Sequence, residues 1–347
     1  MGFINFTDTA QTNEPGVNEV PPVGPKNARI AFIGEAPGRT EVKYGKPFVG
    51  DAGRVFDHCL HEAGIIRAQC YVTNFIKTPI GKGIETYVGR NGLTQRGIYW
   101  RERLADELRT VEADLLVPLG GPAAMAVAGV RSISSSRGYL TYALDDFGGK
   151  ATLPVLHPAS CLYGGSYINK YYIAHDFRKA LSILGDDFGV KEPHIPAVRF
   201  PTTVGEVERM VQEMRDAGIF AFDIEVANFE VSCISFASSS SLAYSVLLCD
   251  KELWTDREEL QIWTLLASIL EDSSLAKVGQ NLIFDIHFLL THQHIYVRGP
   301  TVDTMIGHSL VYPDFLKGLR FLASIHTNVP DWKDMVKFKG GNVKKES

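Results

Sequence analysis

The feature that most constrains the fold is a short apolar strand that runs into a loop of glycine and proline, within residues 28–53 (ARIAFIGEAPGRTEVKYGKPFVGDAG). Residues 29–33 are β-prone and mostly apolar, as expected of a buried strand in a parallel sheet. The loop follows the carboxyl end of this strand, the edge at which open α/β sheets bind ligands. Gly34, Pro37 and Gly38 would let the backbone approach a bound group closely. We interpret this stretch as an active-site loop.

Length and charge bound the classes of protein that this chain can belong to. Its 347 residues are enough for two domains, and 45% apolar with 22% charged residues is typical of a soluble globular protein. The formal net charge of −5 excludes a globally basic DNA-binding protein. Any contact with DNA would therefore depend on local basic clusters, for which the candidates are Lys43, Lys46, Lys77, Lys82 and Arg90.

Cysteine usage and hydropathy narrow the classes further. The five cysteines, at positions 59, 70, 161, 233 and 249, contain no CxxC pair, so neither a disulfide framework nor a zinc finger is indicated. The N-terminus lacks the charged start and apolar core of a signal peptide. The most apolar run, residues 115–130, is interrupted by proline and glycine and is shorter than a membrane-spanning helix. We expect a soluble, cytoplasmic protein that has no contact with a membrane.

The first half of the chain alternates between strand and helix patterns. Residues 1–27 are polar and aperiodic, so we expect a disordered arm there. The patterns that follow predict strands over 71–74, 114–119 and 151–156, and helices over 53–63, 98–112, 122–128 and 169–184. Such alternation predicts a parallel sheet covered by helices, within a domain over residues 28–184. The glycine-rich, charged stretch 81–97 is either a contact to DNA or a mobile surface loop.

A second α/β pattern follows a stretch of acids, prolines and glycine at residues 185–201, which we interpret as a domain linker. The next domain is expected over residues 202–338, followed by a polar tail over 339–347. Its helix over 203–217 would begin with Thr203 and Glu206 as a capping box. Strands are predicted over 219–225, 231–237 and 242–248.

Four motifs, in order, resemble those of family 4 uracil-DNA glycosylases. They are Gly34-Glu35-Ala36-Pro37-Gly38 with Glu41 and residues 45–50 (GKPFVG), then residues 71–77 (YVTNFIK), residues 115–121, and His157-Pro158-Ala159. The resemblance covers residues 28–182, about half of the chain. It implies a three-layer α/β/α fold with a mostly parallel central sheet. It also implies that uracil-containing DNA is the partner.

The resemblance assigns roles in binding uracil to matching positions. Phe48 would stack on a flipped uracil, and Asn74 would read the Watson–Crick edge of the base. The alternatives are core packing for Phe48 and a turn cap at a strand end for Asn74. The full set of uracil-binding candidates is Gly34, Ala36, Pro37, Gly38, Phe48 and Asn74.

Hydrolysis of a glycosidic bond passes through an oxocarbenium-like sugar and a uracil anion, so the site needs a donor at O2 of uracil and a nearby carboxylate. His157 is the candidate donor, although a histidine after a strand also occurs as a purely structural residue. Glu35 and Glu41 are the candidate carboxylates, and the sequence leaves open which one acts on water and which one forms the pocket wall that excludes the methyl group of thymine. Leu162 or Tyr163 would wedge into the duplex or be buried.

Many family 4 enzymes hold an iron–sulfur cluster with cysteines, two of them in the N-terminal arm. Here no cysteine precedes Cys59, and the third and fourth cluster positions correspond to Thr78 and Trp100. We therefore expect no cluster in this chain, and no other cofactor for the glycosylase.

The second domain carries a different pattern of acidic residues. Asp223 and Glu225 stand at positions i and i+2 of an apolar strand, which directs both carboxylates to one face. Together with Asp285 in residues 278–285 (VGQNLIFD), they resemble the first two motifs of the 3′ to 5′ exonuclease (DnaQ-like) domain of family A DNA polymerases. The resemblance implies an RNase H-like α/β fold, and Mg²⁺ or Mn²⁺ bound by these three residues.

The last exonuclease motif, Tyr-x-x-x-Asp, should follow these two, but it does not occur between Asp285 and Ser347. His326 and Asp331 have the spacing of the alternative His-x4-Asp motif, but their segment matches a helix that lies between motifs in the family. We therefore expect an exonuclease domain that is incomplete.

The two resemblances together predict a uracil-DNA glycosylase joined to a proofreading-type domain, as at the front end of a phage DNA polymerase. A DNA polymerase domain or subunit is then a further expected partner, and the host cytoplasm the expected location. The alternative is a non-catalytic uracil-sensing or DNA-binding module of such a polymerase, which the missing cysteines and the missing motif would favour.

Overall fold

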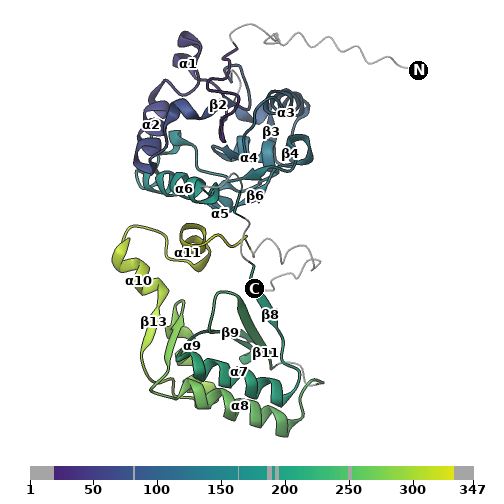
Figure 1. Ribbon diagram of the computed structural model, residues 1–347, viewed down its shortest axis with the longest axis vertical. Coiled ribbons are helices and arrows are strands. Elements are labelled where there is room, and N and C mark those ends of the chain that lie inside the picture. The colour runs from purple at the N-terminus through teal and green to yellow at the C-terminus, as the bar shows by residue number, and fades with distance from the viewer. Residues whose placement is uncertain are drawn as a thin grey trace, which may run out of the picture. The chain divides into compact units, whose positions relative to one another are not determined.

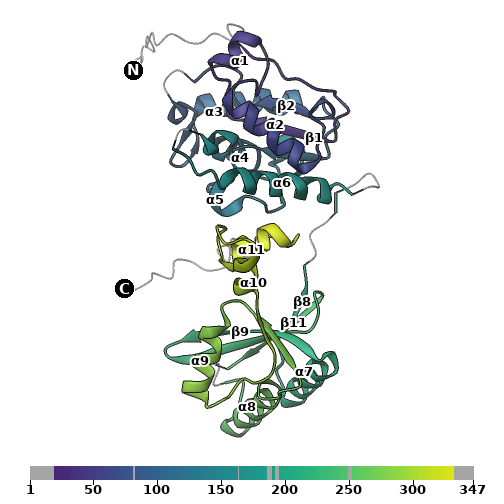
Figure 2. The same cartoon turned by 90° about the vertical axis from the view of Figure 1, so that its left-hand side faces the viewer.

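The computed structural model describes residues 19–80, 83–162, 164–185, 190–191, 195–248 and 252–331. The chain divides into two compact units, the first made of Met1–Pro193 with Ala323–Ser347 and the second of His194–Leu322. Figures 1 and 2 show the elements of each unit. No helix in the described ranges is both long and apolar enough to cross a membrane.

The first unit is built on a five-stranded sheet with the order β2-β1-β5-β7-β6, in which only the pairing of β6 with β7 is antiparallel. The strands are β1 Ile30–Gly34, β2 Tyr71–Asn74, β5 Leu115–Pro118, β6 Thr141–Tyr142 and β7 Ala151–Thr152, and a separate hairpin consists of β3 Val88–Gly89 and β4 Gly92–Leu93. The parallel order agrees with the strand and helix alternation of the sequence.

Helices cover both faces of this sheet. They are α1 Arg39–Tyr44, α2 Asp51–Ala63, α3 Gln95–Leu108, α4 Gly121–Ala128, α5 Ile133–Ser136 and α6 Asn169–Ile183, with 3-10 helices η1 Arg67–Gln69, η2 Ile84–Thr86, η3 Asp145–Phe147 and η4 Pro158–Cys161. Phe32 of β1 packs in a core with α2 and α6, whereas the next residue, Ile33, packs with α3 and α4. Because neighbouring side chains of a strand point to opposite faces, β1 anchors both cores and the unit has three layers, as predicted.

The second unit has a six-stranded sheet with the order β13-β12-β9-β10-β11-β8. Its elements are β8 Ala197–Arg199, α7 Val204–Ala217, β9 Ile219–Ala227, β10 Glu230–Ala237, β11 Leu242–Leu247, α8 Asp256–Leu270, β12 Ala276–Gly279, α9 Leu282–Gln293, β13 Thr301–Asp303 and α10 Thr304–Val311. Three antiparallel strands followed by two strands parallel to the first form the RNase H-like arrangement expected from the sequence. The core lies between this sheet and residues of α7, α8 and α9.

The last described helix, α11 Leu319–His326, leads into residues that belong to the first unit. Lys179 is buried in α6, and its Nζ donates to the carbonyl oxygens of Ser324 at 2.8 Å and Thr327 at 2.6 Å. These bonds satisfy carbonyls at the C-terminal end of a helix, where intrahelical partners run out. The sequence pattern instead placed these residues in the domain over 202–338.

Two segments that were expected to lack regular structure, the N-terminal arm and the domain linker, are partly ordered. Residues 19–27 were expected in a disordered arm, yet Val20 is buried and Val23 forms an antiparallel bridge with Val72. The backbone N–H and C=O of Val23 both bond to Val72, on the edge of β2 away from β1. Residues 197–199 were expected in the linker but pair with β11 as β8. Residues 1–18 and the tail over 339–347 lie outside the described residues.

Element ends also differ from the sequence pattern. The helix expected over 98–112 begins earlier, at Gln95, because the Oγ1 of Thr94 accepts the N–H of Gly97 at its N-terminus. The strand expected over 151–156 is paired as a strand only over Ala151–Thr152. The capping box of α7 is half formed, since Thr203 accepts the N–H of Glu206 while the Glu206 carboxylate accepts the N–H of Thr202.

The positions that correspond to cluster cysteines are occupied by packed side chains. Thr78 and Trp100 are both buried, Trp100 in the core beneath α3. The guanidinium of Arg103 lies 4.8 Å from the centre of the Trp100 ring and forms an ion pair with Glu19. An aromatic ring, an ion pair and a hydroxyl therefore fill this region, and none of them is a ligand of iron–sulfur clusters.

We predict that the purified protein is colourless and contains no iron–sulfur cluster, because thiolate ligands are missing at all four family positions. Iron and acid-labile sulfide analysis, together with the visible absorption spectrum, checks this expectation. Stoichiometric iron would contradict it.

Candidate active site

The candidate glycosylase site lies at the carboxyl edge of the first sheet. Gly34, the last residue of β1, pairs in parallel register with Asn74, the last residue of β2. On the other side of β1, Gly120 follows β5, and its N–H donates to the carbonyl of Val155 at 2.8 Å, two residues before His157. The sheet thus brings Asn74 and His157 to the same edge as the loop that follows β1.

Three of the predicted site residues meet around Gly34. A Cβ atom built on Gly34 would lie 2.3 Å from Oδ1 of Asn74 and 2.7 Å from the ring of Phe48. The side chains of Phe48 and Asn74 are nearly buried, with 5% and 4% exposure. The Phe48 ring also lies 5.9 Å from the imidazole of His157, at an interplanar angle of 32°. Only a glycine can occupy position 34 without displacing the other groups.

Phe48 has an unusual backbone conformation. Its φ is +53°, in the left-handed region that costs a non-glycine residue about 1–3 kcal/mol. Its ring packs against Phe56 of α2, with centroids 4.8 Å apart. Surrounding contacts therefore have to hold this conformation, and the carboxylate of Glu41 supplies several of them.

The carboxylate of Glu41, in α1, accepts hydrogen bonds from three backbone N–H groups. One oxygen, Oε1, accepts the N–H of Val49 at 3.1 Å and that of Gly50 at 2.8 Å. The other, Oε2, accepts the N–H of Gly38 at 3.1 Å. These bonds join the loop after β1 to the turn that carries Phe48. The arrangement favours a positioning role for Glu41 over the catalytic role that the sequence also allowed.

Glu35 has a different environment. It follows Gly34 directly and is partly buried, and within the described residues its carboxylate makes no hydrogen bond or ion pair. Burial raises the pKa of Glu35, and the negative charge of Glu85 raises it further. A carboxylate with a raised pKa is a stronger base than an ordinary glutamate. Of the two candidates, Glu35 is the one with oxygens available to a water molecule or a sugar.

His157 is held as a neutral ring with a defined tautomer. Its Nδ1 accepts the N–H of Ala159 at 3.1 Å, at the start of η4. Since Nδ1 acts as an acceptor, the proton of the neutral imidazole is on Nε2. Burial lowers the pKa of His157 to about 4, against the opposing effect of Glu41. At neutral pH the ring can therefore donate one hydrogen bond from Nε2.

The remaining predicted residues are placed as follows. Pro37 is buried and Ala36 is partly buried against the core beneath α3, whereas Gly38 is exposed at the N-terminus of α1. Leu162 is partly buried just beyond η4, and Tyr163 lies outside the described residues.

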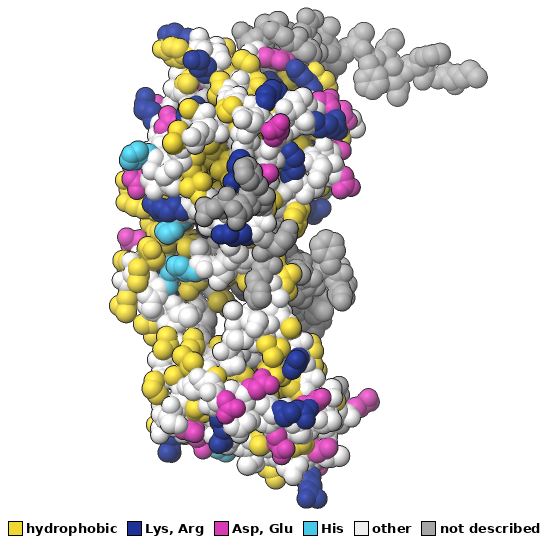
Figure 3. Space-filling model, in the orientation of Figure 1, with side chains coloured by type: hydrophobic (Ala, Val, Ile, Leu, Met, Phe, Trp, Pro, Cys, Tyr) yellow, Lys and Arg dark blue, Asp and Glu magenta, His cyan; other side chains and the backbone are white. Residues whose placement is uncertain are grey.

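The basic candidates for DNA contact separate into two kinds. Lys43, Lys46 and Arg90 are exposed. Lys77 is buried and pairs with Glu107 at 2.7 Å, so the expectation that it contacts DNA is wrong, and Lys82 lies outside the described residues. On the face shown in Figure 3, basic and acidic side chains are interspersed, without one continuous basic surface.

The stretch over residues 81–97 is ordered where it is described. It contains η2, the β3–β4 hairpin and the start of α3, and Tyr87 within it is buried in the core beneath α3. Its Glu85 is the residue whose charge acts on Glu35. One end of this stretch therefore lies near the loop after β1, which the sequence did not indicate.

Sequence reasoning also missed two residues of the site. Gly120, with φ +91°, lets His157 approach, since a Cβ there would lie 3.0 Å from Cβ of His157. Arg67, in η1, donates to the carbonyls of Pro47 and Phe48. Gly120 lies within the motif over residues 115–121, but the sequence assigned it no role. No local pattern indicates Arg67, because its partners lie some twenty residues earlier in the chain.

In the second unit, the acidic residues lie as the alternation predicted. Asp223 and Glu225 are on the exposed face of β9. Asp285 is buried in the first turn of α9, and its Oδ1 accepts the N–H of Ile224 at 2.9 Å. Burial, with the charges of Asp285 and Glu225, raises the pKa of Asp223 to about 6. The three carboxylates are thus close enough to repel one another.

As arranged in the structure, these carboxylates do not form a metal site. Among the described residues, no group of three or more His, Cys, Asp or Glu side chains is arranged so that it could hold a metal ion. Their mutual repulsion suits a cation, but their geometry does not fit one as they stand. His326 and Asp331 belong to the first unit, whereas the three carboxylates belong to the second.

Comparisons with known proteins agree with both resemblances. The family model "Uracil DNA glycosylase superfamily" matches residues 21–180, and the model "3'-5' exonuclease" matches residues 198–335. The type-4 uracil-DNA glycosylase of Archaeoglobus fulgidus is 31% identical over 182 residues, which is 51% of this chain and 85% of that protein. The type-4 uracil-DNA glycosylase of Thermotoga maritima is 31% identical over 163 residues, 46% of this chain and 80% of that protein.

Among solved structures, RNase D of Trypanosoma brucei matches at 18% identity with a TM-score of 0.26, over 31% of this chain and 39% of that one. RNase D of Escherichia coli matches at 18% identity with a TM-score of 0.29, over 43% of this chain and 35% of that one. The chain therefore spans well under half the length of these two proteins. From the family models and the curated relatives together, the chain belongs to the type-4 uracil-DNA glycosylase family and carries a 3′ to 5′ exonuclease domain after its glycosylase domain.

Proposed function

We propose that the first domain removes uracil from DNA by hydrolysing its N-glycosidic bond, leaving an abasic site. The observation that carries this proposal is that Phe48 and Asn74 meet at Gly34, at the carboxyl edge of the sheet, with His157 beside the Phe48 ring. These three supply what the reaction needs from a base pocket: an aromatic surface, an amide that pairs with the base edge, and a neutral donor for the leaving base.

Asn74 selects the base in this proposal. A carboxamide can donate to O4 of uracil and accept from its N3–H in one plane, whereas cytosine presents a donor in place of O4. Asn74 is nearly buried, so a mismatched donor would lose its hydrogen bond to water. An unpaired buried donor costs about 1–3 kcal/mol, which is enough to discriminate between the two bases.

His157 stabilises the leaving uracil. As the bond to the sugar breaks, negative charge develops on O2 of the base. A neutral imidazole can stabilise this charge by donating a hydrogen bond from Nε2, and its protonation state does not have to change first. The bond from Ala159 to Nδ1 fixes the ring so that the donor atom is always Nε2.

Glu35 is the carboxylate that acts on the attacking water or on the sugar, and Glu41 is a positioning residue. The difference lies in their hydrogen bonds, because Glu41 is held by three backbone N–H groups whereas Glu35 makes no bond within the described residues. A positive charge on the sugar during bond cleavage would also be stabilised by the Glu35 carboxylate.

The first prediction of this mechanism concerns His157 and Asn74. We expect His157→Ala to slow the single-turnover release of uracil by about 10²- to 10³-fold, as when one donor to a developing anion is lost. Asn74→Asp should weaken the preference for uracil over cytosine, because a carboxylate cannot donate to O4. His61→Ala, at an exposed position in α2, is the matched control. Unchanged excision by folded His157→Ala would refute its role.

The second prediction concerns pH. Glu35 has to be ionised to act as a base, so the excision rate should fall as pH falls through its raised pKa, above the ordinary value of 4.5. His157 stays neutral in this range because its pKa is about 4. We therefore expect Glu35→Gln to be slow and to lack this acidic fall, whereas Glu41→Gln retains it. A fall centred near pH 6.5 would instead point to protonation of a histidine.

A non-catalytic uracil-sensing module would use the same residues to bind uracil without cleavage. The likeness to curated glycosylases favours the enzyme, and release of free uracil from a uracil-containing oligonucleotide separates the two. An association with a DNA polymerase and a cytoplasmic location stay predictions.

For the second domain, which carries the carboxylates of Asp223, Glu225 and Asp285, we propose little or no exonuclease activity in this chain. A divalent ion, when bound there, would activate water and stabilise the leaving 3′ oxygen. The three carboxylates are not placed to hold it, and the Tyr-x-x-x-Asp motif of the family does not occur within residues 286–347.

We expect the 347-residue protein to show little Mg²⁺-dependent 3′ to 5′ degradation of single-stranded DNA, and Asp223→Ala to remove what remains. Asp216→Ala, an exposed acid at the end of α7, serves as the control. Rapid degradation that depends on Asp223 would show that the incomplete site is sufficient.

A further inference from the structure

The turn that carries Phe48 is held from two sides. On one side, the N–H groups of Val49 and Gly50 donate to Glu41. On the other, the guanidinium of Arg67 donates to the carbonyls of Pro47 at 2.8 Å and Phe48 at 3.0 Å. The peptide groups before and after Phe48 are therefore both fixed, although its φ of +53° is disfavoured for a residue with a side chain.

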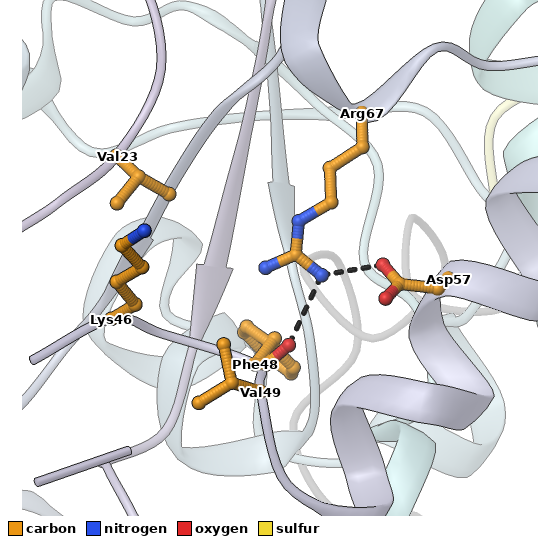
Figure 4. A pocket seen from close by; sticks show the side chains of 6 residues that line it. All are labelled: Val23, Lys46, Phe48, Val49, Asp57 and Arg67. Carbon is orange, nitrogen blue, oxygen red and sulfur yellow. Dashed lines mark hydrogen bonds and ion pairs between the residues drawn. The ribbon is translucent and has the colours of Figure 1, made fainter. Parts of the chain in front are cut away.

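Arg67 is itself fixed in place. It forms an ion pair with Asp57 of α2, and its guanidinium lies 5.4 Å from the centre of the Phe56 ring. Figure 4 shows the guanidinium between Asp57 and the Phe48 carbonyl. Because a guanidinium is planar with several donors, one side chain can hold two carbonyls and a carboxylate together. A lysine could not reproduce this geometry.

The surroundings give the turn room to relax if Arg67 is lost. A cavity of about 450 Å³ is lined by Val23, Lys46, Phe48, Val49, Asp57 and Arg67. Figure 4 shows these side chains around it, with Arg67 on the side of α2. Gly53 packs closely against the same carbonyl, since a Cβ there would lie 2.2 Å from the Phe48 carbonyl oxygen. Without Arg67, the turn that carries Phe48 would border this open space with one fewer contact to hold it.

We propose that Arg67 is a positioning residue for uracil excision, which fixes the ring of Phe48 in the base site by holding the carbonyls of Pro47 and Phe48. The proposal rests on the proposed function, since Phe48 is the stacking surface for the base. In this proposal Arg67 acts on the base site through the turn that carries Phe48 and not by contact with the substrate.

Arg67 is not needed to fill a core. Its side chain retains 29% exposure, and its contacts are carbonyls, a partly exposed carboxylate and the face of one ring. Replacement by methionine keeps most of the length of the side chain but removes every donor. We therefore expect Arg67→Met to fold, and to differ from wild type in the order of the turn.

The test is a double-mutant cycle on the full chain with wild type, Arg67→Met, Phe48→Ala and the double variant, assayed for single-turnover release of uracil from an oligonucleotide. We expect Arg67→Met to lose about 10- to 100-fold in rate, as for a small misplacement of a binding group. In the Phe48→Ala background the same change should cost less than about twofold, because the ring that it positions is gone. Arg67→Lys should fall between wild type and Arg67→Met.

A second measurement is independent of activity. Hydrogen exchange of a peptide that covers residues 45–55 should be faster in Arg67→Met than in wild type. It should be unchanged in Arg109→Met, because Arg109 is an exposed arginine just after α3 that pairs with Asp106. Equal losses in both backgrounds of the cycle, or unchanged exchange in the turn, would overturn the proposal. A wild type that releases no uracil would refute the proposed function, and the exchange experiment would still decide whether Arg67 holds the turn.

Discussion

The parallel pairing of β1 with β2 is the constraint on which the glycosylase site depends. Its register sets Gly34 opposite Asn74, so the loop after β1 begins beside the amide that would read the base. Both strands are fully buried, and a shift by one residue would turn their apolar side chains from one core to the other. The packing of the two cores on either side of β1 therefore fixes the position of the Asn74 amide, although this polar group belongs to neither core.

Several site residues could be predicted from sequence because they follow strands directly. Asn74 ends a strand and His157 comes shortly after one, and carboxyl ends of parallel strands meet at one edge. The role of Glu41 could not be predicted, since it depends on the N–H groups of Val49 and Gly50, and these are brought back to α1 by the intervening turn. Arg67 was missed for the same reason.

The errors about order have a related cause. Residues 19–27 have the composition of a disordered segment, but two valines and one ion pair are enough to attach them to the unpaired edge of β2 and to α3. Residues 197–199 look like a linker because they are few and exposed, yet they pair with β11 through backbone groups that composition does not report. Main-chain hydrogen bonds help to order both segments. Sequence patterns report on side chains, so they do not detect these bonds.

One physical rule applies to the carboxylates of both domains. Glu41 and Asp285 accept backbone N–H groups, which fix each side chain in one place. Glu35 makes no such bond within the described chain, and Asp223 has a pKa raised by burial and by like charges. Both oxygens of Glu41 therefore hold backbone, whereas Glu35 and Asp223 have oxygens left for a water molecule or a cation. In each domain the sequence assigned carboxylates with different hydrogen bonds to the same task. A motif gives the type of residue but does not show whether backbone N–H groups already occupy its oxygens.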